Sequence, residues 1–425
     1  MNFHTARGTA RRRKHVRIGI TTALATLLAA TSLGFLGVPA GSASTKKLTP
    51  FVVGAVLPLS GSYAVVGDAE GPALQAIVRY DNLHGGVLGH QISVHIVNDA
   101  STVQGAIAAT RKLVANYKMN LFFPDTITAE TLASLPFAKG ILSVDVCAST
   151  ECGDGRMFPD SFSFNPPPQA LFQAGAEYMA AKGYKTVGLI ADQTSSGQTF
   201  VQYTTQYLTA LGVKVVGPVY VPAGTTSVAT QLSQLESAGA DSVSSWASQF
   251  GINVLMNGMQ SLGWSVPVVM PNGFNTGQPV STLVPTSVAS QVVCICDAVS
   301  IRTSSIIPAY LNKLFGIMTG YGAVTSLELT SLMIDEFTLG VYGYDKAGKL
   351  SDAAAAKAIE SMNSDKKLSN SGIFFAYHGV NPGFTKYDHF PAVAPLLTGG
   401  YFKLGTVGPD VRGTYPGTNL VLKNS

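Results

Sequence analysis

The chain has 425 residues, 46% of them hydrophobic, and a formal net charge of +4. Six basic residues and no acidic ones lie within residues 1–43, so removal of that segment changes the net charge from +4 to −2. That balance excludes the strongly basic surface by which nucleic acids are bound, and we expect no nucleic-acid partner. The rest of the chain exceeds the size at which a single core stops growing, which predicts two lobes.

Residues 1–43 have the pattern of an export signal. A basic segment is followed by an apolar stretch over 18–38 and by the small residues Ala40-Gly41-Ser42-Ala43. This pattern predicts a signal peptide cleaved after Ala43. A retained membrane anchor is the alternative, since about 20 apolar residues can span a bilayer. No cysteine directly follows the apolar stretch, so we expect an exported, extracytoplasmic protein without a lipid anchor.

From residue 49 the apolar pattern alternates between strand and helix. Phe51 to Leu57 is an apolar run closed by Pro58, and residues around Leu74 then recur at helical spacing. Such alternation is typical of a parallel sheet covered by helices. The expected strands are 51–57, 92–96, 121–123 and 141–144, and the expected helices lie around 74–82, 103–114 and 129–139.

A second set of the same kind follows the proline-rich break Asn165-Pro166-Pro167-Pro168. Its expected strands are 186–190, 213–216, 241–246 and 266–269, and its expected helices are 171–179, 200–211, 228–235 and 254–262. Two such units predict an α/β protein with two Rossmann-like lobes and parallel sheets. Ligands of such sheets bind beyond the carboxyl ends of the strands, in the cleft-facing loops. One added strand is expected near 400–404.

The four cysteines lie in two pairs. Cys147 and Cys152 are five residues apart in a loop and are candidates for a small disulfide ring. Cys294 and Cys296 share one face of an expected strand, where a mutual bridge would be strained, so free thiols and a cross-link both stay open. No Cys or His cluster has the spacing of metal ligands, and we expect no metal and no cofactor.

The common catalytic motifs are absent from the sequence. It has no G-x-S-x-G elbow, no glycine-rich phosphate loop followed by Lys-Ser/Thr and no H-E-x-x-H helix. Asp99 and Asp125 have no spacing that singles them out as a catalytic pair, and we expect solvated or capping roles for both. The sequence therefore does not favour an enzyme.

Several segments occur in an order that is similar to a known family. They are Val53 to Gly61, Gly67-Asp68, Gly85 to Gly89, Asn98-Asp99-Ala100, Arg111 to Val114, Lys185 to Asp192 with Gly197, Pro222 to Ser227, and Leu235 to Asp241. From about residue 50 to 275 the chain resembles the branched-chain amino-acid (Leu/Ile/Val) type of periplasmic binding proteins of ABC transporters. The resemblance weakens beyond that point.

The resemblance implies the type I periplasmic binding protein fold, in which the chain crosses between two hinged lobes three times. It places the crossovers near Phe164–Pro168, near Ala298–Ile301 and around Gly379–Lys386. Lobe 1 is then 50–167 with about 298–380, and lobe 2 is 168–297 with about 381–420. The implied function is capture of a small organic solute and its delivery to ABC permease subunits. A ligand-sensing regulator or receptor subunit of the same fold is the alternative.

The resemblance also points to ligand contacts in the cleft loops. Ser60-Gly61 ends the first strand, where donors can approach a polar ligand group, although turn chemistry alone also explains it. The implied contacts are Ser60, Gly61, Tyr63, Val66, Thr126, Cys147, Ala148, Ser149, Ser196, Ser248 and Asn272.

At four of these positions the chain departs from the family pattern. Val66, Ser196 and Ser248 stand where an aromatic residue is common, and Asn272 stands where the family has an acid for the ligand ammonium. A buried ammonium without a compensating anion is costly, and Asn supplies no charge. We therefore expect a polar organic acid, an amide or an atypical amino acid as the ligand. Trp246, Tyr63 and Phe250 are candidates for stacking, although core or rim positions are the commoner role for such residues.

Overall fold

The computed structural model describes residues 48–248, 250–271, 287–288, 291–297, 327–365, 368, 382–391, 397–401 and 414–420. Residues 48–425 form one compact unit. Within it the described strands form two sheets, as the sequence predicts.

The first sheet has five strands in the order β2-β1-β3-β4-β5, and every neighbouring pair is parallel. The first four strands match the predicted ones, whereas the short β5 was not predicted. The strands are β1 (Phe51–Leu57), β2 (Ile92–Asn98), β3 (Leu121–Phe123), β4 (Leu142–Asp145) and β5 (Ser161–Ser163), and the helices are α1 (Ala64–Leu83), α2 (Val103–Asn116), α3 (Thr128–Ser134), α11 (Leu327–Ala347) and α12 (Asp352–Glu360).

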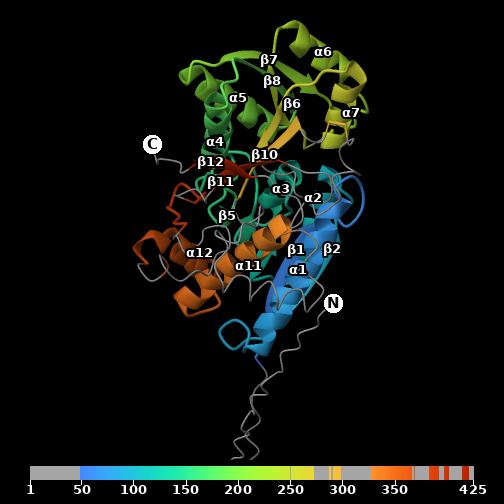
Figure 1. Ribbon diagram of the computed structural model, residues 1–425. Helices are drawn as coiled ribbons and strands as arrows, with labels where there is room; N and C mark the ends of the chain where they lie inside the picture. The colour runs from blue at the N-terminus through green and yellow to red at the C-terminus, as the bar shows by residue number, and fades with distance from the viewer. Residues whose placement is uncertain are drawn as a thin grey trace, which may run out of the picture. The chain divides into compact units, whose positions relative to one another are not determined.

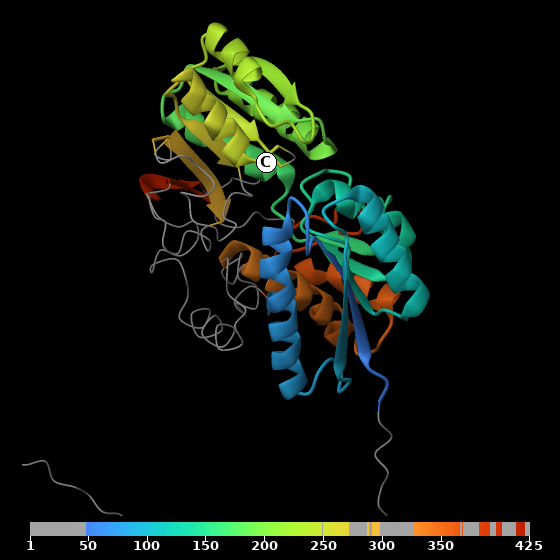
Figure 2. The ribbon, with the colours of Figure 1, turned by 90° about the vertical axis from the view of Figure 1, so that its right-hand side faces the viewer.

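Alternate residues of β1 enter two separate cores. Phe51, Val53, Ala55 and Leu57 pack with α1, α11 and α12, while Val56 packs with α2 on the opposite face. Figure 2 shows α1 and α2 on opposite faces of this sheet, and Figure 1 shows α1 beside α11. The period of two in the strand thus decides which helix each side chain meets.

The second sheet has seven strands in the order β12-β11-β10-β9-β8-β6-β7. Strands β6 to β10 pair in parallel, and β11 and β12 are added antiparallel. The strands are β6 (Thr186–Asp192), β7 (Lys214–Val221), β8 (Ser242–Trp246), β9 (Val268–Pro271), β10 (Val292–Asp297), β11 (Leu397–Tyr401) and β12 (Thr414–Leu420), and the helices are α4 (Pro168–Ala181), α5 (Ser195–Ala210), α6 (Ala229–Ser237) and α7 (Ile252–Leu262).

This sheet is also covered on both faces. Ile190 packs with α6 and α7, whereas its neighbours Leu189 and Ala191 pack with α4 and α5. The added strand expected near 400–404 lies at 397–401, and a further strand, β12, was not predicted. In the part of the chain that the structure describes, no helix combines the length and the apolar character needed to cross a membrane.

Three helices that follow a strand carry, in their first turn, a glycine pressed against the chain at the end of that strand. A Cβ on Gly67 would lie 2.5 Å from the carbonyl oxygen of Pro58, and one on Gly105 would lie 1.7 Å from that of Asp99. On Gly197 it would lie 2.3 Å from the carbonyl oxygen of Asp192. The motif glycines therefore let α1, α2 and α5 dock closely at the carboxyl ends of β1, β2 and β6.

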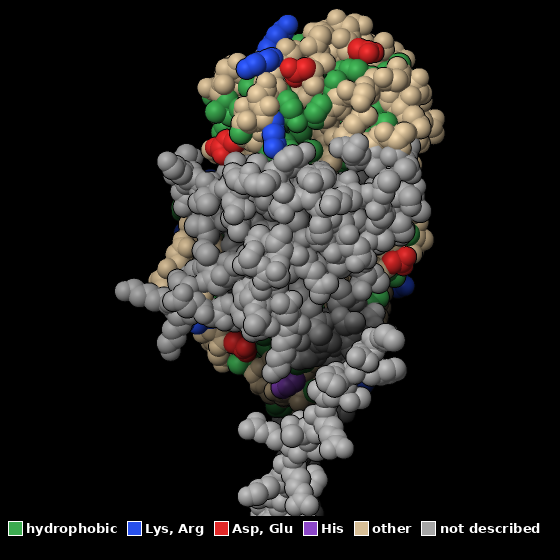
Figure 3. Space-filling view, viewed as in Figure 1, with side chains coloured by type: hydrophobic (Ala, Val, Ile, Leu, Met, Phe, Trp, Pro, Cys, Tyr) green, Lys and Arg blue, Asp and Glu red, His purple; other side chains and the backbone are tan. Residues whose placement is uncertain are grey.

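Figure 3 shows the charged side chains of the described residues on one face of the protein. There the described acidic and basic side chains are few and lie scattered among neutral ones.

Candidate functional site

Five parallel strands end at one edge of the first sheet, and the loops after them carry most of the predicted site. The loop after β1 is tied to the loop after β2. Ser101 Oγ donates to the carbonyl oxygen of Ser60 at 2.7 Å and accepts from Tyr63 N at 3.0 Å. Asn98 Nδ2 donates to Ser60 Oγ at 2.7 Å, and Gly61 has φ +91°. These bonds fix the exposed Ser60 at the start of α1.

Tyr63 lies just before α1, and Val66 lies in the first turn of that helix. Val66 is buried in a small apolar cluster with Ala69 and Leu329, and the half-buried Tyr63 packs against that cluster. Burial, and then the charges of Glu130, Asp192 and Asp125, raise the pKa of the Tyr63 hydroxyl. Tyr63 is therefore a neutral hydrogen-bonding group surrounded by acids.

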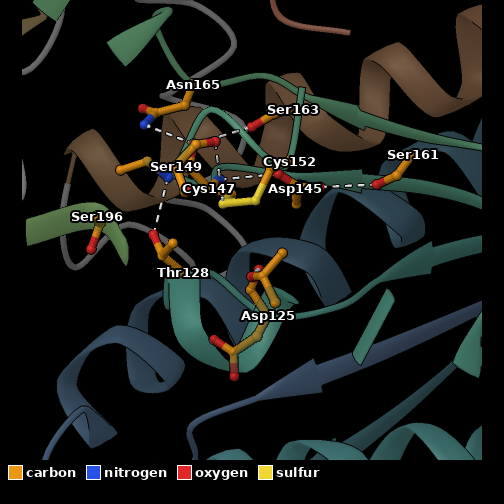
Figure 4. Close-up of a disulfide and its surroundings, with 12 residues drawn as sticks. Asp125, Thr128, Asp145, Cys147, Ser149, Cys152, Ser161, Ser163, Asn165 and Ser196 are labelled. Carbon is orange, nitrogen blue, oxygen red and sulfur yellow. Dashed lines mark hydrogen bonds between the residues drawn. A yellow bond between two sulfur atoms is a disulfide. The ribbon is translucent and has the colours of Figure 1, made fainter. Parts of the chain in front are cut away.

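The loop after β4 is closed by a disulfide between Cys147 and Cys152, with a Cα–Cα distance of 6.1 Å (Figure 4). Ala148 and Ser149 lie inside this ring, and both are almost fully buried. The disulfide is one of the pairings that the sequence left open. The side chains of Cys294 and Cys296 lie outside the described residues.

Neighbouring strands hold the backbone of this ring (Figure 4). Cys147 N donates to Asp145 Oδ1 at 3.0 Å, and the carbonyl oxygen of Cys147 accepts from Ser163 Oγ and Asn165 Nδ2, both at 3.3 Å. Ala148 N donates to Thr128 Oγ1 at 3.0 Å. Burial raises the pKa of Asp145 to about 6, while the bonds that it accepts oppose that rise.

Thr126 contacts a buried acid. Its Oγ1 lies 2.6 Å from Oε1 of Glu70, which projects from α1 and has no exposed surface. Burial raises the pKa of Glu70 to about 8, and the bond to Thr126 acts in the opposite direction. The sequence analysis did not single out Glu70.

The expectation that Asp99 and Asp125 are solvated is wrong. Both are buried, with exposed fractions of 0% and 2%, because α2 and α3 cover the strand ends that they follow. Neither residue caps a helix, because the N-cap is Thr102 in α2 and Ile127 in α3. Both carboxylates accept backbone amides of the turn before the helix: Asp99 Oδ1 accepts from Ser101 N, and Asp125 Oδ1 accepts from Thr126 N and Ile127 N. Burial, and then the adjacent Asp99, raise the pKa of Asp125 well above its usual range.

Asp125 also has an unusual backbone conformation. Its φ of +123° lies in a region that favours glycine. In this conformation the carboxylate of Asp125 accepts hydrogen bonds from the backbone amides of the next two residues.

The corresponding edge of the second sheet brings together Asp192, Ser196 and Ser248. Ser248 Oγ donates to Asp192 Oδ2 at 2.5 Å, and Thr194 N donates to Asp192 Oδ1 at 3.2 Å. Trp246 Nε1 donates to Ser196 Oγ at 3.1 Å. Ser196 and Ser248 thus make hydrogen bonds with the polar groups of Trp246 and Asp192.

The candidate stacking residues differ in their surroundings. Phe250 is buried in the core between the sheet, α6 and α7, so it is a core residue. Trp246 is half-buried, stacks on Phe200 and meets Phe172 edge-on, which leaves part of the indole accessible. Asn272 lies outside the described residues.

Among the described residues, the one group with the proximity of metal ligands consists of Asp145, Cys147 and Cys152. Both sulfur atoms belong to the disulfide and therefore supply no thiolate. This group does not fit a metal ion.

The sequence analysis missed Glu70, Thr128, Glu130, Asn165 and Asp192 as site residues. Asp192 directly ends a strand, and Asn165 directly precedes the proline run, so their positions carried a usable signal. Glu70 and Glu130 lie inside helices, and only packing reveals that they are buried at the same sheet edge.

The described chain thus has two α/β sheets with polar loops at their carboxyl ends. Residues 50–298 match the family model described as periplasmic binding protein. The chain belongs to this family.

Relatives with curated descriptions are similar to part of the chain. Leu/Ile/Val-binding protein homolog 8 of Brucella suis is 24% identical over 232 residues, which cover 52% of this chain and 57% of the relative. Homolog 7 of Brucella abortus is 24% identical over 202 residues, or 45% of this chain and 50% of the relative. The chain thus spans about half the length of the curated relatives that it matches.

Solved structures share the fold over a longer span. A type 1 periplasmic binding protein of Bordetella pertussis has a TM-score of 0.69 at 19% identity, over 86% of this chain and 100% of its own. An R. palustris solute-binding protein solved with benzoate has 0.69 at 18%, over 88% and 99%. A Streptococcus pneumoniae branched-chain amino acid transporter substrate-binding protein solved with isoleucine has 0.70 at 17%, over 86% and 99%.

Proposed function

We propose that this protein is the exported solute-binding component of an ABC importer and that it is not an enzyme. The observation that carries the proposal is the set of polar loops at the carboxyl ends of both parallel sheets, on a fold shared with solute-binding proteins. Helix α3, which follows β3 of the first sheet, contacts helix α5, which follows β6 of the second, and this contact supports a site formed by both edges. The solute would be held between these edges and presented to permease subunits.

The lobes follow from the membership of the two sheets. Lobe 1 comprises 50–167 and the segment with α11 and α12, and lobe 2 comprises 168–297 and the strands β11 and β12. Residues just after the third crossover expected near Gly379–Lys386 still bond to the first sheet: His389 N donates to the Gly153 carbonyl, and the His389 carbonyl accepts from Ser163 N. We therefore place the third crossover after His389 and before β11. The first crossover, near Phe164–Pro168, lies within the described residues, whereas the second, expected near Ala298–Ile301, lies outside them.

The ligand contacts that we propose in lobe 1 are Ser60, Gly61, Tyr63, Val66, Thr126, Cys147, Ala148 and Ser149. Those that we propose in lobe 2 are Ser196, Ser248 and Asn272. Because burial favours the protonated forms of Glu70 and Asp125, the lobe 1 edge is less anionic than its acids suggest. That edge suits a polar organic acid, an amide or an atypical amino acid.

Export and maturation belong to the same proposal. The signal peptide would be removed after Ala43. N-terminal sequencing of the exported protein should then find Ser44 as the first residue, and a different first residue would contradict this cleavage site. An oxidising compartment would then allow the disulfide between Cys147 and Cys152 to form.

A thermal-shift screen tests solute capture directly. We expect at least one compound among amino acids, aromatic carboxylates and amides to raise the melting temperature of the mature protein. At a hundredfold excess over Kd a ligand adds about 2.7 kcal/mol to the free energy of unfolding. The same mixtures are analysed by chromatography after incubation, and conversion of the bound compound would contradict the non-catalytic role.

A further inference from the structure

Glu70 is a buried carboxyl group directly behind a proposed ligand contact. Its Oε1 lies 2.6 Å from Thr126 Oγ1, and within the described chain its Oε2 has no hydrogen-bond partner. Glu70 is completely buried in α1, and Thr126 is half-buried at the sheet edge. The contact therefore joins a solvent-excluded acid to a half-buried threonine that we propose as a ligand contact.

The titratable groups around Glu70 are also acids. The charge of Glu70 acts on Glu336 of α11 and on Asp125 of the loop after β3. Asp145 and Asp335 act on Glu336 in turn. Burial raises the pKa of Glu70 to about 8, and the hydrogen bond with Thr126 lowers it only in part. The carboxyl group therefore keeps its proton at neutral pH.

The proton on Glu70 decides what Thr126 can offer. A threonine hydroxyl has one donor hydrogen and two acceptor lone pairs. A protonated Glu70 donates to Thr126 Oγ1, and the threonine hydrogen is then available to an acceptor group of the solute. An ionised Glu70 can only accept a hydrogen bond, so the threonine hydroxyl donates to the carboxylate. The threonine then offers only its oxygen lone pairs to the solute.

We propose that Glu70 is a positioning residue that sets Thr126 as a hydrogen-bond donor toward the solute and reverses that polarity when it loses its proton. The role toward solute rests on the proposed function, whereas the proton on Glu70 does not. The site would thus select an acceptor group, such as a carboxylate or an amide oxygen, and release it as the pH rises.

The first experiment requires no ligand. Urea unfolding is followed from about pH 6 to about pH 9 for the wild type, Glu70→Gln and Thr126→Val. A native carboxyl with a raised pKa binds a proton that the unfolded chain has lost, so stability falls with rising pH until the native pKa is passed. Across two pH units below that point this single proton changes the unfolding constant about a hundredfold.

Glu70→Gln should reduce the pH dependence by the share of this one proton, while Asp125 and Glu336, whose pKa values burial also raises, keep their shares. The contribution of Glu70, taken as the difference from the curve without its carboxyl group, levels off once the native pKa is passed. Thr126→Val should move that levelling point to higher pH, because the ionised carboxylate loses its donor. If the free energy of unfolding of Glu70→Gln depends on pH as steeply as that of the wild type, the claim that Glu70 is protonated is wrong. An unchanged levelling point in Thr126→Val would overturn the reversal of the hydrogen bond.

The second experiment uses benzoate, whose carboxylate stays ionised over this pH range. Calorimetry should give a Kd for the wild type about tenfold weaker at about pH 9 than at about pH 6, the effect of one hydrogen bond to a charged group. Glu70→Gln, whose amide donates at every pH, should bind with a constant Kd. The matched control Glu336→Gln removes a neighbouring buried acid that lacks the contact with Thr126, and it should keep the wild-type dependence.

The outcomes separate the two proposals. An equal pH dependence of benzoate binding in wild type and Glu70→Gln would overturn the role of Glu70 toward solute. If benzoate does not bind at either pH, that result counts against an aromatic acid as the solute. In that case the unfolding curves alone test whether Glu70 is protonated and whether its hydrogen bond with Thr126 reverses.

Discussion

Gly105→Ala and Gly197→Ala should each lower the free energy of unfolding by about 3 kcal/mol, the range of severe overpacking. The new Cβ atoms would lie 1.7 Å from the Asp99 carbonyl oxygen and 2.3 Å from that of Asp192. Backbone oxygens cannot rotate away, so the helix start or the strand end must move. Urea unfolding of the purified variants measures the loss.

Gly175→Ala is the matched control for these two variants. Gly175 also lies in a helix, α4, but its Cβ would meet no atom within 4 Å. We expect a gain of about 0.5–1 kcal/mol, because alanine is the better helix former. Equal changes in the free energy of unfolding at all three positions would show that helix propensity, and not contact with the strand ends, determines the effect of these substitutions.

Because Asp99 and Asp192 belong to the site edges, displacement there should also weaken solute binding. This effect is measured as the ratio of the Kd of the variant to the Kd of the wild type, for any compound that the thermal-shift screen finds. Gly175→Ala should leave this Kd unchanged.

Removing the disulfide with Cys147→Ala/Cys152→Ala should destabilise the protein by about 2 kcal/mol, the amount expected for a short closed loop. Both cysteines are fully buried, and the ring encloses Ala148 and Ser149. The greater freedom of the opened ring should also weaken solute binding, since ordering it costs free energy on binding. Chemical unfolding and calorimetry measure the two effects.

The control for the disulfide prediction is reduction of the wild-type protein. Because the sulfur atoms are buried, a mild reductant should leave the native protein oxidised and act only under partly denaturing conditions. A double variant as stable as the wild type would contradict the bond, as would two free thiols found by mass spectrometry of the native exported protein.

The sheets were predictable because their signals are local. The apolar runs at 51–57 and 186–190 and the closing glycines, prolines and polar turns mark most parallel strands within a few residues. Strand β5 has only three residues, two of them serines, and it lacks the apolar pattern of a buried strand. Strands β11 and β12 are added antiparallel from a distant part of the chain, and no local pattern predicts that pairing.

The site was predictable only in part. The loops with Ser60, Thr126 and Ala148 were located through the family resemblance, and the structure places them at one sheet edge. The environment of the acids was not predictable. Glu70 is a charged residue in a helical pattern, and its burial depends on the packing of α1 against α11, more than 250 positions later in the chain. The same limit explains the wrong expectation for Asp99 and Asp125.

Solution X-ray scattering of the mature protein, with and without a compound from the screen, tests solute capture by two hinged lobes most directly. A solute that contacts both sheet edges shifts the open–closed equilibrium toward the closed form. We predict a smaller radius of gyration at saturating solute and recovery of the original curve after dialysis, with the solute chemically unchanged. Identical scattering curves at saturation would contradict capture by closure, and a chemically altered solute would contradict a purely binding role.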